Sequence, residues 1–551
     1  MSMNATEIGK SESTWNINCS HFPPDFIFGV GTSAYQHEGG AVKGGRGPSI
    51  WDVFTLNAPG RIDDGSNGNV AADMYTKYKD DIKMMRSMGF DAYRFSISWS
   101  RILPGGRLSL GVNKEGIDYY NDLINTIIAN DMKPFITLFH FDLPQSLQQE
   151  YDGFLSRDVV VKYWITLNEP WSYAHNGYVT RKFPPLGRDL TGALRSAAPT
   201  SSPPALTQNS KPKMMNYIPY RARPHDEQHN QFLKAAAAPN QFSSSGSRQR
   251  WDPAKDAYTV ARNLLLAHAE AYHAYRNKFE EHQKGYIGIA LNALWCEPYK
   301  KDDADDIEAS KRAMDFGLGW FLEPVLTGQY PKRMRDFVPS ENLAPISERE
   351  AEMLKGSIDF LGLNYYTAIY AANNPNPGAD VQEGYSRDQH VKFSYTDPLG
   401  TLIGPQYKDK VPVMYITENG VDEENDYRLT AKDACADSMR EDYLKRHLQK
   451  LLDAINNDKV NVKGYFAWSW CDNFEWSEGY TERLGLYENA EGVGVATHAL
   501  QYTERQPYWQ LEWKRLPLVG VALQEISGSA VGGGAPRFPL SCPSWTFIWS
   551  S

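Results

Sequence analysis

The stretch Ile-Thr-Leu-Asn-Glu-Pro at residues 165–170 decides the fold, together with Tyr-Ile-Thr-Glu-Asn-Gly at residues 415–420. Each is an apolar, β-branched run that ends on a glutamate, Glu169 or Glu418, where a buried strand should end. Carboxylates at the C-terminal ends of parallel strands can face each other across one pocket. One acid that protonates a leaving oxygen and one carboxylate that attacks a sugar carbon are the groups that cleave a glycosidic bond. The two segments therefore predict parallel strands that carry a glycosidase site.

The rest of the chain alternates predicted strands with predicted helices. Eight apolar segments are predicted strands, at residues 26–31, 92–96, 134–140, 163–168, 287–294, 360–365, 413–417 and 462–468. Helical patterns occupy residues 74–87, 114–130, 254–279, 307–318 and 438–456. This alternation predicts an α/β fold, a closed (β/α)8 TIM barrel, and a chain of 551 residues is long enough for one decorated barrel.

Composition narrows the class of partner. The net charge is −10 and no Lys/Arg block stands out, so we expect no nucleic acid partner. Aromatic residues make up 13% of the chain, which suits a site that stacks sugar rings, although an aromatic core gives the same count. The polar N-terminus lacks the apolar core of a signal peptide, and no segment is long enough to span a bilayer. These features predict a cytoplasmic protein with no membrane partner.

Cysteine usage gives no sign of a disulfide framework or a metal site. The five cysteines are scattered, without Cys-x-x-Cys or Cys/His ligand spacing. We therefore expect no metal.

Seven stretches of the chain resemble plant β-glucosidases of glycoside hydrolase family 1. They include Ser-Ala-Tyr-Gln at 33–36 and Asn-Tyr-Tyr-Thr at 364–367, and they span residues 22–52, 93–104, 139–145, 164–177, 360–367, 415–422 and 464–485. About two thirds of the chain is covered. The resemblance is closest to the group that hydrolyses glucosides of monoterpenoid indole alkaloids, and it implies a retaining β-glucosidase that needs no cofactor.

The resemblance assigns the two glutamates their roles. Glu169 matches the family's general acid/base, and Glu418 matches its nucleophile. In retaining glycosidases the two carboxyl groups lie about 5–5.5 Å apart, so that one attacks C1 while the other protonates the leaving oxygen. We expect the pKa of Glu169 to be raised in the free enzyme and to fall once Glu418 is esterified, because the like charge has then gone.

Four further residues resemble groups that support these glutamates. Asn168 resembles the residue that hydrogen-bonds the sugar 2-hydroxyl. Tyr366 and Asn364 resemble residues beside the nucleophile, where a phenol that donates to Glu418 would hold the carboxylate ionised and aimed. Arg94 resembles the arginine that keeps the nucleophile anionic.

The glucose pocket of the family has counterparts here as well. Gln36, His140 and Glu475 match residues that hydrogen-bond glucose hydroxyls, with Trp476 beside Glu475. Trp468 resembles the platform for the pyranose ring. Polar side chains and one indole face together recognise the polar rim and the apolar C–H face of a sugar.

Single residues of these types are often structural. An isolated glutamine, histidine or tryptophan is more often a core or loop residue than a ligand, and Arg94 could be an ion-pair partner only. The functional interpretation rests on their co-occurrence at successive strand ends. Four acidic residues close to the motifs are interpreted as structural instead, namely Glu38, Asp142, Asp472 and Glu478.

The chain departs from the family pattern inside the pocket and in the scaffold. Phe141 and Leu484 stand where the family usually has Trp and Phe. The barrel helices that the family places before strands four and seven have no counterpart, because few residues remain between 156 and 162 and between 406 and 411. Each missing helix would expose apolar side chains worth roughly 1.5–3 kcal/mol apiece.

These departures shape the predicted organisation. We expect a disordered segment at residues 1–20, the barrel at 21–487 with a disordered insertion at about 189–250, and an atypical, poorly ordered tail at 488–551. A splice variant or a faulty gene model would explain such gaps.

The sequence leaves three alternatives to a hydrolytic β-glucosidase to consider. The first is a catalytically impaired, sugar-binding pseudoenzyme that arises from the scaffold gaps. A thioglucosidase is disfavoured because glutamine typically stands at the position of Glu169 in that group. A transglucosidase shares every residue named above and stays open, as do the aglycone and the oligomeric state.

Overall fold

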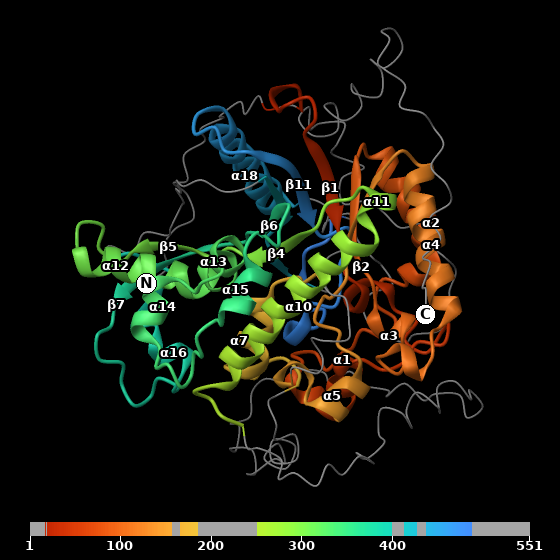
Figure 1. The fold of residues 1–551 in the computed structure, drawn as a ribbon. Helices are drawn as coiled ribbons and strands as arrows, with labels where there is room; N and C mark the ends of the chain where they lie inside the picture. Colours follow the sequence, from red (N-terminus) through yellow and green to blue (C-terminus); the bar gives the residue numbers. More distant parts are fainter. Residues whose placement is uncertain are drawn as a thin grey trace, which may run out of the picture.

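A computed structural model describes residues 17, 19–156, 166–185, 251–398, 413–426 and 437–486 of the chain. Seven parallel strands form its central sheet, in the order β3-β2-β1-β11-β9-β6-β4 (Figure 1). Their bounds are β1 Ile27–Gly31, β2 Ala92–Ser96, β3 Lys133–Thr137, β4 Gly288–Asn292, β6 Phe360–Asn364, β9 Met414–Asn419 and β11 Val462–Trp468. Six of them begin and end within two residues of a predicted strand, and β3 ends three residues before the strand predicted at 134–140.

The segment that carries Glu169 joins the two edges of this sheet. Leu167 bridges Phe139, just beyond β3, and Asn168 bridges Ala290 in β4, both in parallel orientation. The amide of Asn168 donates to the Phe139 carbonyl at 3.0 Å, and the amide of Glu169 donates to the Ala290 carbonyl at 2.8 Å. The curled parallel sheet is consistent with a TIM-type barrel.

Aromatic side chains fill the space between the central strands. Phe135 packs on Phe466 and on Tyr415, with ring centroids 4.7 and 5.4 Å apart. A side chain at Gly29 would place its Cβ 2.3 Å from the ring of Phe466, so glycine is required there. Because aromatic side chains occupy the space between the strands, the polar residues lie at the ends of the strands.

The helices that flank the sheet follow the predicted pattern closely. The segments predicted at 74–87 and 438–456 are α2 Met74–Ser87 and α18 Ser438–Asn456, and the one predicted at 114–130 is α4 Lys114–Ala129. Asp437 starts α18 by accepting from the Arg440 amide at 2.9 Å. Figure 1 shows α2 and α4 together on one side of the strands and the long α10 on another. The remaining helices are α1 Ile50–Asn57, α3 Trp99–Ile102, α5 Gln145–Tyr151, α7 Pro170–Tyr178, α10 Asp256–Lys278, α11 Glu280–Gln283, α12 Ala304–Met314, α13 Trp320–Thr327, α14 Lys332–Phe337, α15 Glu348–Leu354 and α16 Tyr385–Asp388.

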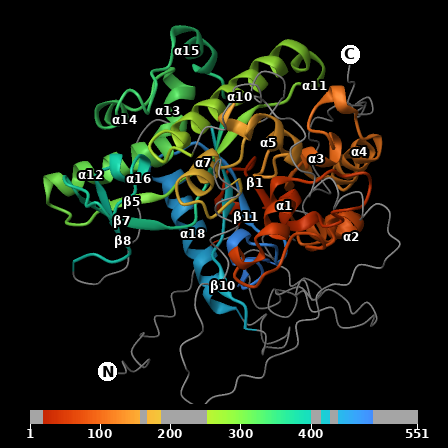
Figure 2. The ribbon, with the colours of Figure 1, turned by 90° about the horizontal axis from the view of Figure 1, so that it is seen from below.

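A second, smaller sheet lies beside the barrel strands and was not predicted. It consists of β5 Trp295–Pro298, β7 Ala368–Asn373 and β8 Val391–Ser394, in the order β5-β7-β8. Helix α12 packs on β5 and β7, and the group stands apart from the central strands in both ribbon views (Figure 2). A two-stranded antiparallel pair, β10 Glu423–Glu424 and β12 Glu482–Arg483, completes the described strands.

Several predictions fall outside the described residues. Both places where a barrel helix is expected to be missing lie in residues 157–165 and 399–412, and the insertion and the whole tail lie in 186–250 and 487–551. The described chain begins with buried Ile17 and the short turn Cys19–His21. In the ranges that the structure describes, no helix combines the length and apolar character needed to cross a bilayer.

Candidate active site

The predicted site residues come from many strands but meet in one place. Each lies on a strand of the central sheet, on the segment that joins its edges, or in the loop or short helical turn that follows a strand. They are Gln36, Arg94, His140, Asn168, Glu169, Asn364, Tyr366, Glu418, Trp468, Glu475 and Trp476. Parallel strands point their C-terminal ends to the same edge, which explains the gathering.

Glu418, on β9, is held by two donors. Arg94 Nη1 donates to Oε1 at 2.6 Å, and the Tyr366 hydroxyl donates to Oε2 at 2.5 Å. Glu418 and Arg94 are each only 3% exposed, so their ion pair is screened little by solvent. Burial, together with the charge of Glu418, raises the pKa of Tyr366 well above its usual value, so the phenol stays a donor. The arrangement favours an ionised, fixed Glu418 carboxylate.

Glu169 lies in a different environment. Asn364 Nδ2 donates to its Oε1 at 2.9 Å, and the Ser172 hydroxyl donates to its Oε2 at 2.6 Å. Burial, and after it the negative charge of Glu418, raises the pKa of Glu169 from 4.5 to about 7. Its backbone also has φ 42°, the left-handed region that a non-glycine residue adopts at a cost of about 1–3 kcal/mol. A strained, buried carboxyl group that is half protonated near neutral pH is suited to general acid and base work.

Side-chain amides link the two glutamates. The second arm of Arg94, Nη2, donates to Asn168 Oδ1 at 2.7 Å, and Asn364 Nδ2 donates to the same oxygen at 3.0 Å. Because Asn364 also contacts Glu169, one continuous network runs from Glu418 through Arg94, Asn168 and Asn364 to Glu169. A shared network fixes the relative orientation of the two carboxyl groups.

Glu475 and Gln36 form a second polar pair. Gln36 Nε2 donates to Glu475 Oε2 at 3.1 Å, and Asn473 Nδ2 donates to the same oxygen at 2.8 Å. The Ser33 hydroxyl donates to Gln36 Oε1 at 2.6 Å, which fixes the orientation of the Gln36 amide. Burial raises the pKa of Glu475 to about 8, helped by the negative charge of Glu478 and opposed by the hydrogen bond from Asn473. Glu475 keeps some solvent exposure and can exchange a hydrogen bond for one to a ligand.

His140 lies near both predicted tryptophans. Its ring is nearly parallel to those of Trp468 and Trp476, with centroids 5.7 and 6.0 Å away. Burial, and after it the positive charge of Arg94, lowers the pKa of His140 well below its usual value, so the ring is neutral. Its Nε2 lies 3.3 Å from Asn168 Nδ2, and its Nδ1 has no hydrogen-bond partner among the described residues. Both tryptophans therefore lie beside a neutral histidine that can bind a hydroxyl group.

Three polar residues of the site were missed from the sequence. Ser172 contacts Glu169, Thr417 donates to Asn364 Oδ1 at 2.7 Å, and Asn473 contacts Glu475. Thr417 directly precedes Glu418, and Ser172 follows Glu169 by three residues. Only the spacing of Ser172 from Glu169 could have predicted a contact, since i,i+3 positions share a face of a helix.

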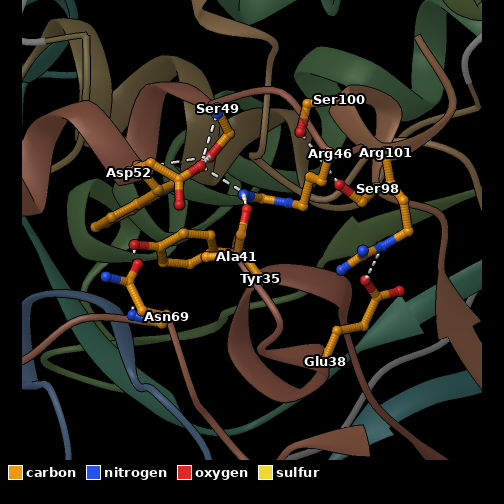
Figure 3. A network of polar contacts seen from close by, with 12 residues as sticks. Tyr35, Glu38, Ala41, Arg46, Ser49, Asp52, Asn69, Ser98, Ser100 and Arg101 are labelled. Carbon is orange, nitrogen blue, oxygen red and sulfur yellow. Dashed lines mark hydrogen bonds and ion pairs between the residues drawn. The ribbon is translucent and has the colours of Figure 1, made fainter. Parts of the chain in front are cut away.

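Two of the acidic residues interpreted as structural are tied into the surrounding scaffold. Glu38 is paired with Arg101, whose Nε lies 3.0 Å from Oε2 (Figure 3). It also accepts from the Tyr120 hydroxyl at 2.5 Å. Asp472 accepts from the Gly485 amide at 3.0 Å. Asp142 is fully buried, and neither of its carboxyl oxygens has a hydrogen-bond partner among the described residues.

A metal centre has no support in the described ranges. In them, no three His, Cys, Asp or Glu side chains are grouped as ligands of an ion. What the geometry offers is acid–base and nucleophilic chemistry by a pair of carboxyl groups in different surroundings, one bound by an arginine and a tyrosine and one with a raised pKa.

Comparison with known proteins gives one consistent result. The profile of glycosyl hydrolase family 1 matches residues 18–200 and 223–498. The chain is 45% identical to raucaffricine-O-β-D-glucosidase of Rauvolfia serpentina, over 88% of this chain and 90% of that protein. It is 42% identical to the ipecoside β-D-glucosidase of Carapichea ipecacuanha, over 86% and 87% respectively.

The fold is similar to solved structures of the same kind. One is a mutant of a rice β-glucosidase in a covalent complex with glucose. It superimposes with a TM-score of 0.73 at 33% identity and covers 91% of this chain and 99% of the rice chain.

Proposed function

The chain belongs to glycosyl hydrolase family 1, and on this premise we propose that it is a retaining β-glucosidase acting by double displacement. Its substrates are O-β-D-glucosides of plant specialised metabolites. The observation that carries the proposal is the contrast between the two glutamates. Glu418 accepts hydrogen bonds from Arg94 and Tyr366, while the pKa of Glu169 is raised to about 7.

The first step uses both glutamates at once. The Glu418 carboxylate attacks C1 of the glucoside, and the bond from C1 to the aglycone oxygen breaks with its electron pair on that oxygen. Protonated Glu169 transfers its proton to the same oxygen, so the aglycone leaves as a neutral alcohol. Asn168 is placed to hydrogen-bond the 2-hydroxyl, a contact that strengthens as positive charge develops at C1.

The second step reverses the role of Glu169. Once Glu418 is esterified, its negative charge no longer raises the pKa of Glu169, so Glu169 is ionised. It takes a proton from water as the water oxygen attacks C1 and releases Glu418. Two displacements at one carbon return the β configuration.

Glucose recognition is assigned to the second polar pair and the aromatic residues. Gln36, His140 and Glu475 bind hydroxyl groups, and Trp468 with Trp476 contacts the apolar face of the ring. The polar pair is already oriented by Ser33 and Asn473, which reduces the ordering cost of binding.

The names of similar proteins support the class of aglycone. Three of them are raucaffricine, ipecoside and oleuropein β-glucosidases of plants. We extend this class to the present chain, and we assign its scaffold as a closed (β/α)8 barrel. The pseudoenzyme alternative is not favoured, because Glu418 is hydrogen-bonded to Arg94 and Glu169 is hydrogen-bonded to Asn364.

Covalent trapping tests the proposal. The full chain is incubated with an activated 2-deoxy-2-fluoro-β-glucoside, which slows the second step more than the first, and is then digested for mass spectrometry. A fluoroglucosyl adduct on the peptide that contains Glu418 is the expected result, and Glu418→Gln is the matched control without an adduct. Folded protein that gains no adduct and hydrolyses no aryl β-glucoside contradicts the proposal. Product analysis with an added alcohol separates hydrolysis from transglucosylation.

A further inference from the structure

We propose that Ser172 is a positioning residue that selects which oxygen of Glu169 carries the transferable proton. This inference rests on the proposed function, because it concerns the acid/base step assigned to Glu169. The Ser172 hydroxyl lies 2.6 Å from Glu169 Oε2, and the serine is 6% exposed.

The local backbone brings the two side chains together. Glu169 is the residue that precedes helix α7, with Pro170 at the first helical position. Its side chain makes no hydrogen bond to the free amides of the helix. Instead it extends to Asn364, and Ser172, three residues later on the same face, reaches back to it.

The contact that Glu169 Oε1 makes with Asn364 determines which of the two carboxyl oxygens is protonated. Thr417 donates to Asn364 Oδ1, and this contact orients the amide so that its Nδ2 points at Glu169 Oε1. An amide nitrogen can only donate, so Oε1 always meets an N–H group. The proton of the neutral acid therefore sits on Oε2, beside the one partner that can either donate or accept.

The serine hydroxyl matches both states of Glu169. When the acid is neutral, Ser172 can turn its proton away and leave the Oε2–H group free to reach the aglycone oxygen. When that proton has moved to the aglycone oxygen, Oε2 holds the new negative charge and Ser172 donates to it. Since the hydroxyl favours the ionised form, it opposes the burial that raises the pKa of Glu169.

The other charged and titratable groups around Glu169 are fixed by neighbouring elements. Glu418 on β9 raises its pKa, Arg94 on β2 lowers it, and Tyr366 after β6 also lies within electrostatic range. None of these is altered by a change at Ser172, so a shift in titration reports the serine alone.

The test compares Ser172→Ala with Ser172→Thr and with Ser310→Ala. Ser310 is a matched control because it is also helical and 8% exposed, and its hydroxyl makes a 2.6 Å hydrogen bond, but to the Cys296 carbonyl in the side sheet. We expect S172A to move the basic limb of kcat/KM upward by about one pH unit, and S172T to restore the parent limb. With a dinitrophenyl glucoside, at a pH below the pKa that Glu169 has in the glucosyl-enzyme, kcat of S172A should fall about tenfold, because less Glu169 is then ionised to take the proton of water. S310A should leave both unchanged.

A second readout does not depend on turnover. Difference infrared spectra, assigned by subtraction of E169Q, follow the carboxyl band of Glu169 with pH and should show the same upward shift in S172A. If the parent hydrolyses glucosides and neither readout moves in folded S172A, the inference is overturned. If the infrared shift occurs in a protein that hydrolyses nothing, the proposed function fails while Ser172 keeps its role. Should S172A not fold, Ser172→Cys, of similar size and a weaker donor, is expected to give a smaller shift in the same direction, and no shift there also overturns the inference.

Discussion

Two buried glutamates in this protein are held by the same kinds of partner. Each is less than a tenth exposed, and each has an arginine nitrogen on one carboxylate oxygen and a tyrosine hydroxyl on the other. The two sets are Glu418 with Arg94 and Tyr366, and Glu38 with Arg101 and Tyr120. Pairing alone therefore does not distinguish a catalytic carboxylate from a structural one.

The difference lies in what the arginine does with its other nitrogens. Arg94 uses its second arm on Asn168, a side chain that belongs to the site. Arg101 donates from Nη1 to the backbone carbonyl of Lys43 and from Nη2 to that of Gly39, both in the segment that follows β1. The Arg94 guanidinium thus binds side chains, whereas the Arg101 guanidinium also binds backbone carbonyls.

The second difference is the hydrogen-bond network that joins Glu418 to a neighbouring carboxyl group. After burial, Glu418 raises the pKa of Glu169, with which it shares this network. Glu38 likewise adds to the burial that raises the pKa of Asp142, but the carboxyl oxygens of Asp142 have no hydrogen-bond partner among the described residues, so no such network joins these two. Four predictions test this comparison.

Removing the carboxylate of Glu418 should have the largest effect. We expect Glu418→Gly to lower kcat/KM for an aryl β-glucoside by about 10⁴-fold or more, because no nucleophile remains. Added azide or formate should restore part of the rate by occupying the vacated space, and azide should give the α-glucosyl product after a single displacement. A β-glucosyl azide, or full activity without the anion, contradicts the assignment.

The matched change at the other glutamate should act on stability. We expect Glu38→Gln to lower the free energy of unfolding by about 3 kcal/mol, since Arg101 is then left buried without its counter-charge. Urea unfolding measures the loss, and kcat per folded molecule should stay at the parent value. A variant that is stable but catalytically dead would erase the distinction between the two pairs.

The titration of Glu169 should appear in the pH dependence of stability. Its pKa is raised from 4.5 to about 7 on folding, so its contribution is fully present below pH 4.5 and is lost as the pH rises through about 7. The loss amounts to about 3 kcal/mol. Glu169→Gln cannot ionise, so the difference in unfolding free energy between parent and variant should change by that amount from pH 4 to pH 8. A constant difference would show that burial does not raise this pKa.

The two tyrosines should give the smallest effects, again in different observables. Loss of one hydrogen bond to a charged group should make Tyr366→Phe about tenfold slower in kcat with unchanged unfolding. Tyr120→Phe should lose about 1–2 kcal/mol of stability and no rate. Paired rate and unfolding measurements on both variants check this, and equal behaviour of the two would contradict it.

The sequence predicted those elements whose signal is local. Helices α2 and α18 have an apolar stripe over four or five turns, and β2 and β11 are mostly apolar, interrupted by Arg94 and Ser96 or by Lys463, and the bounds of all four were predicted without error. The side sheet was missed because Ala368–Asn373 pairs with residues more than 70 positions away at Trp295–Pro298. Short strands of this kind depend on tertiary pairing rather than on their own pattern.

The site divides in the same way. The strand-end position of each glutamate follows from its own segment. The hydrogen bonds of Glu169 to Asn364 and Ser172 instead depend on a left-handed backbone at Glu169 that no local rule demands of this residue type. Helix α7 was likewise not predicted, because its first turn is set by that strained junction.

The bridges of Leu167 and Asn168 couple catalysis to the closing of the barrel. The same few residues that join the two sheet edges also carry the acid/base, and two amide hydrogen bonds anchor them. If these two amide hydrogen bonds opened locally, Glu169 would move away from its position as proton donor while the other strands stay paired. Hydrogen exchange at the amides of Asn168 and Glu169, compared with the rate of glycoside cleavage, would show how far the proposed reaction depends on these two hydrogen bonds.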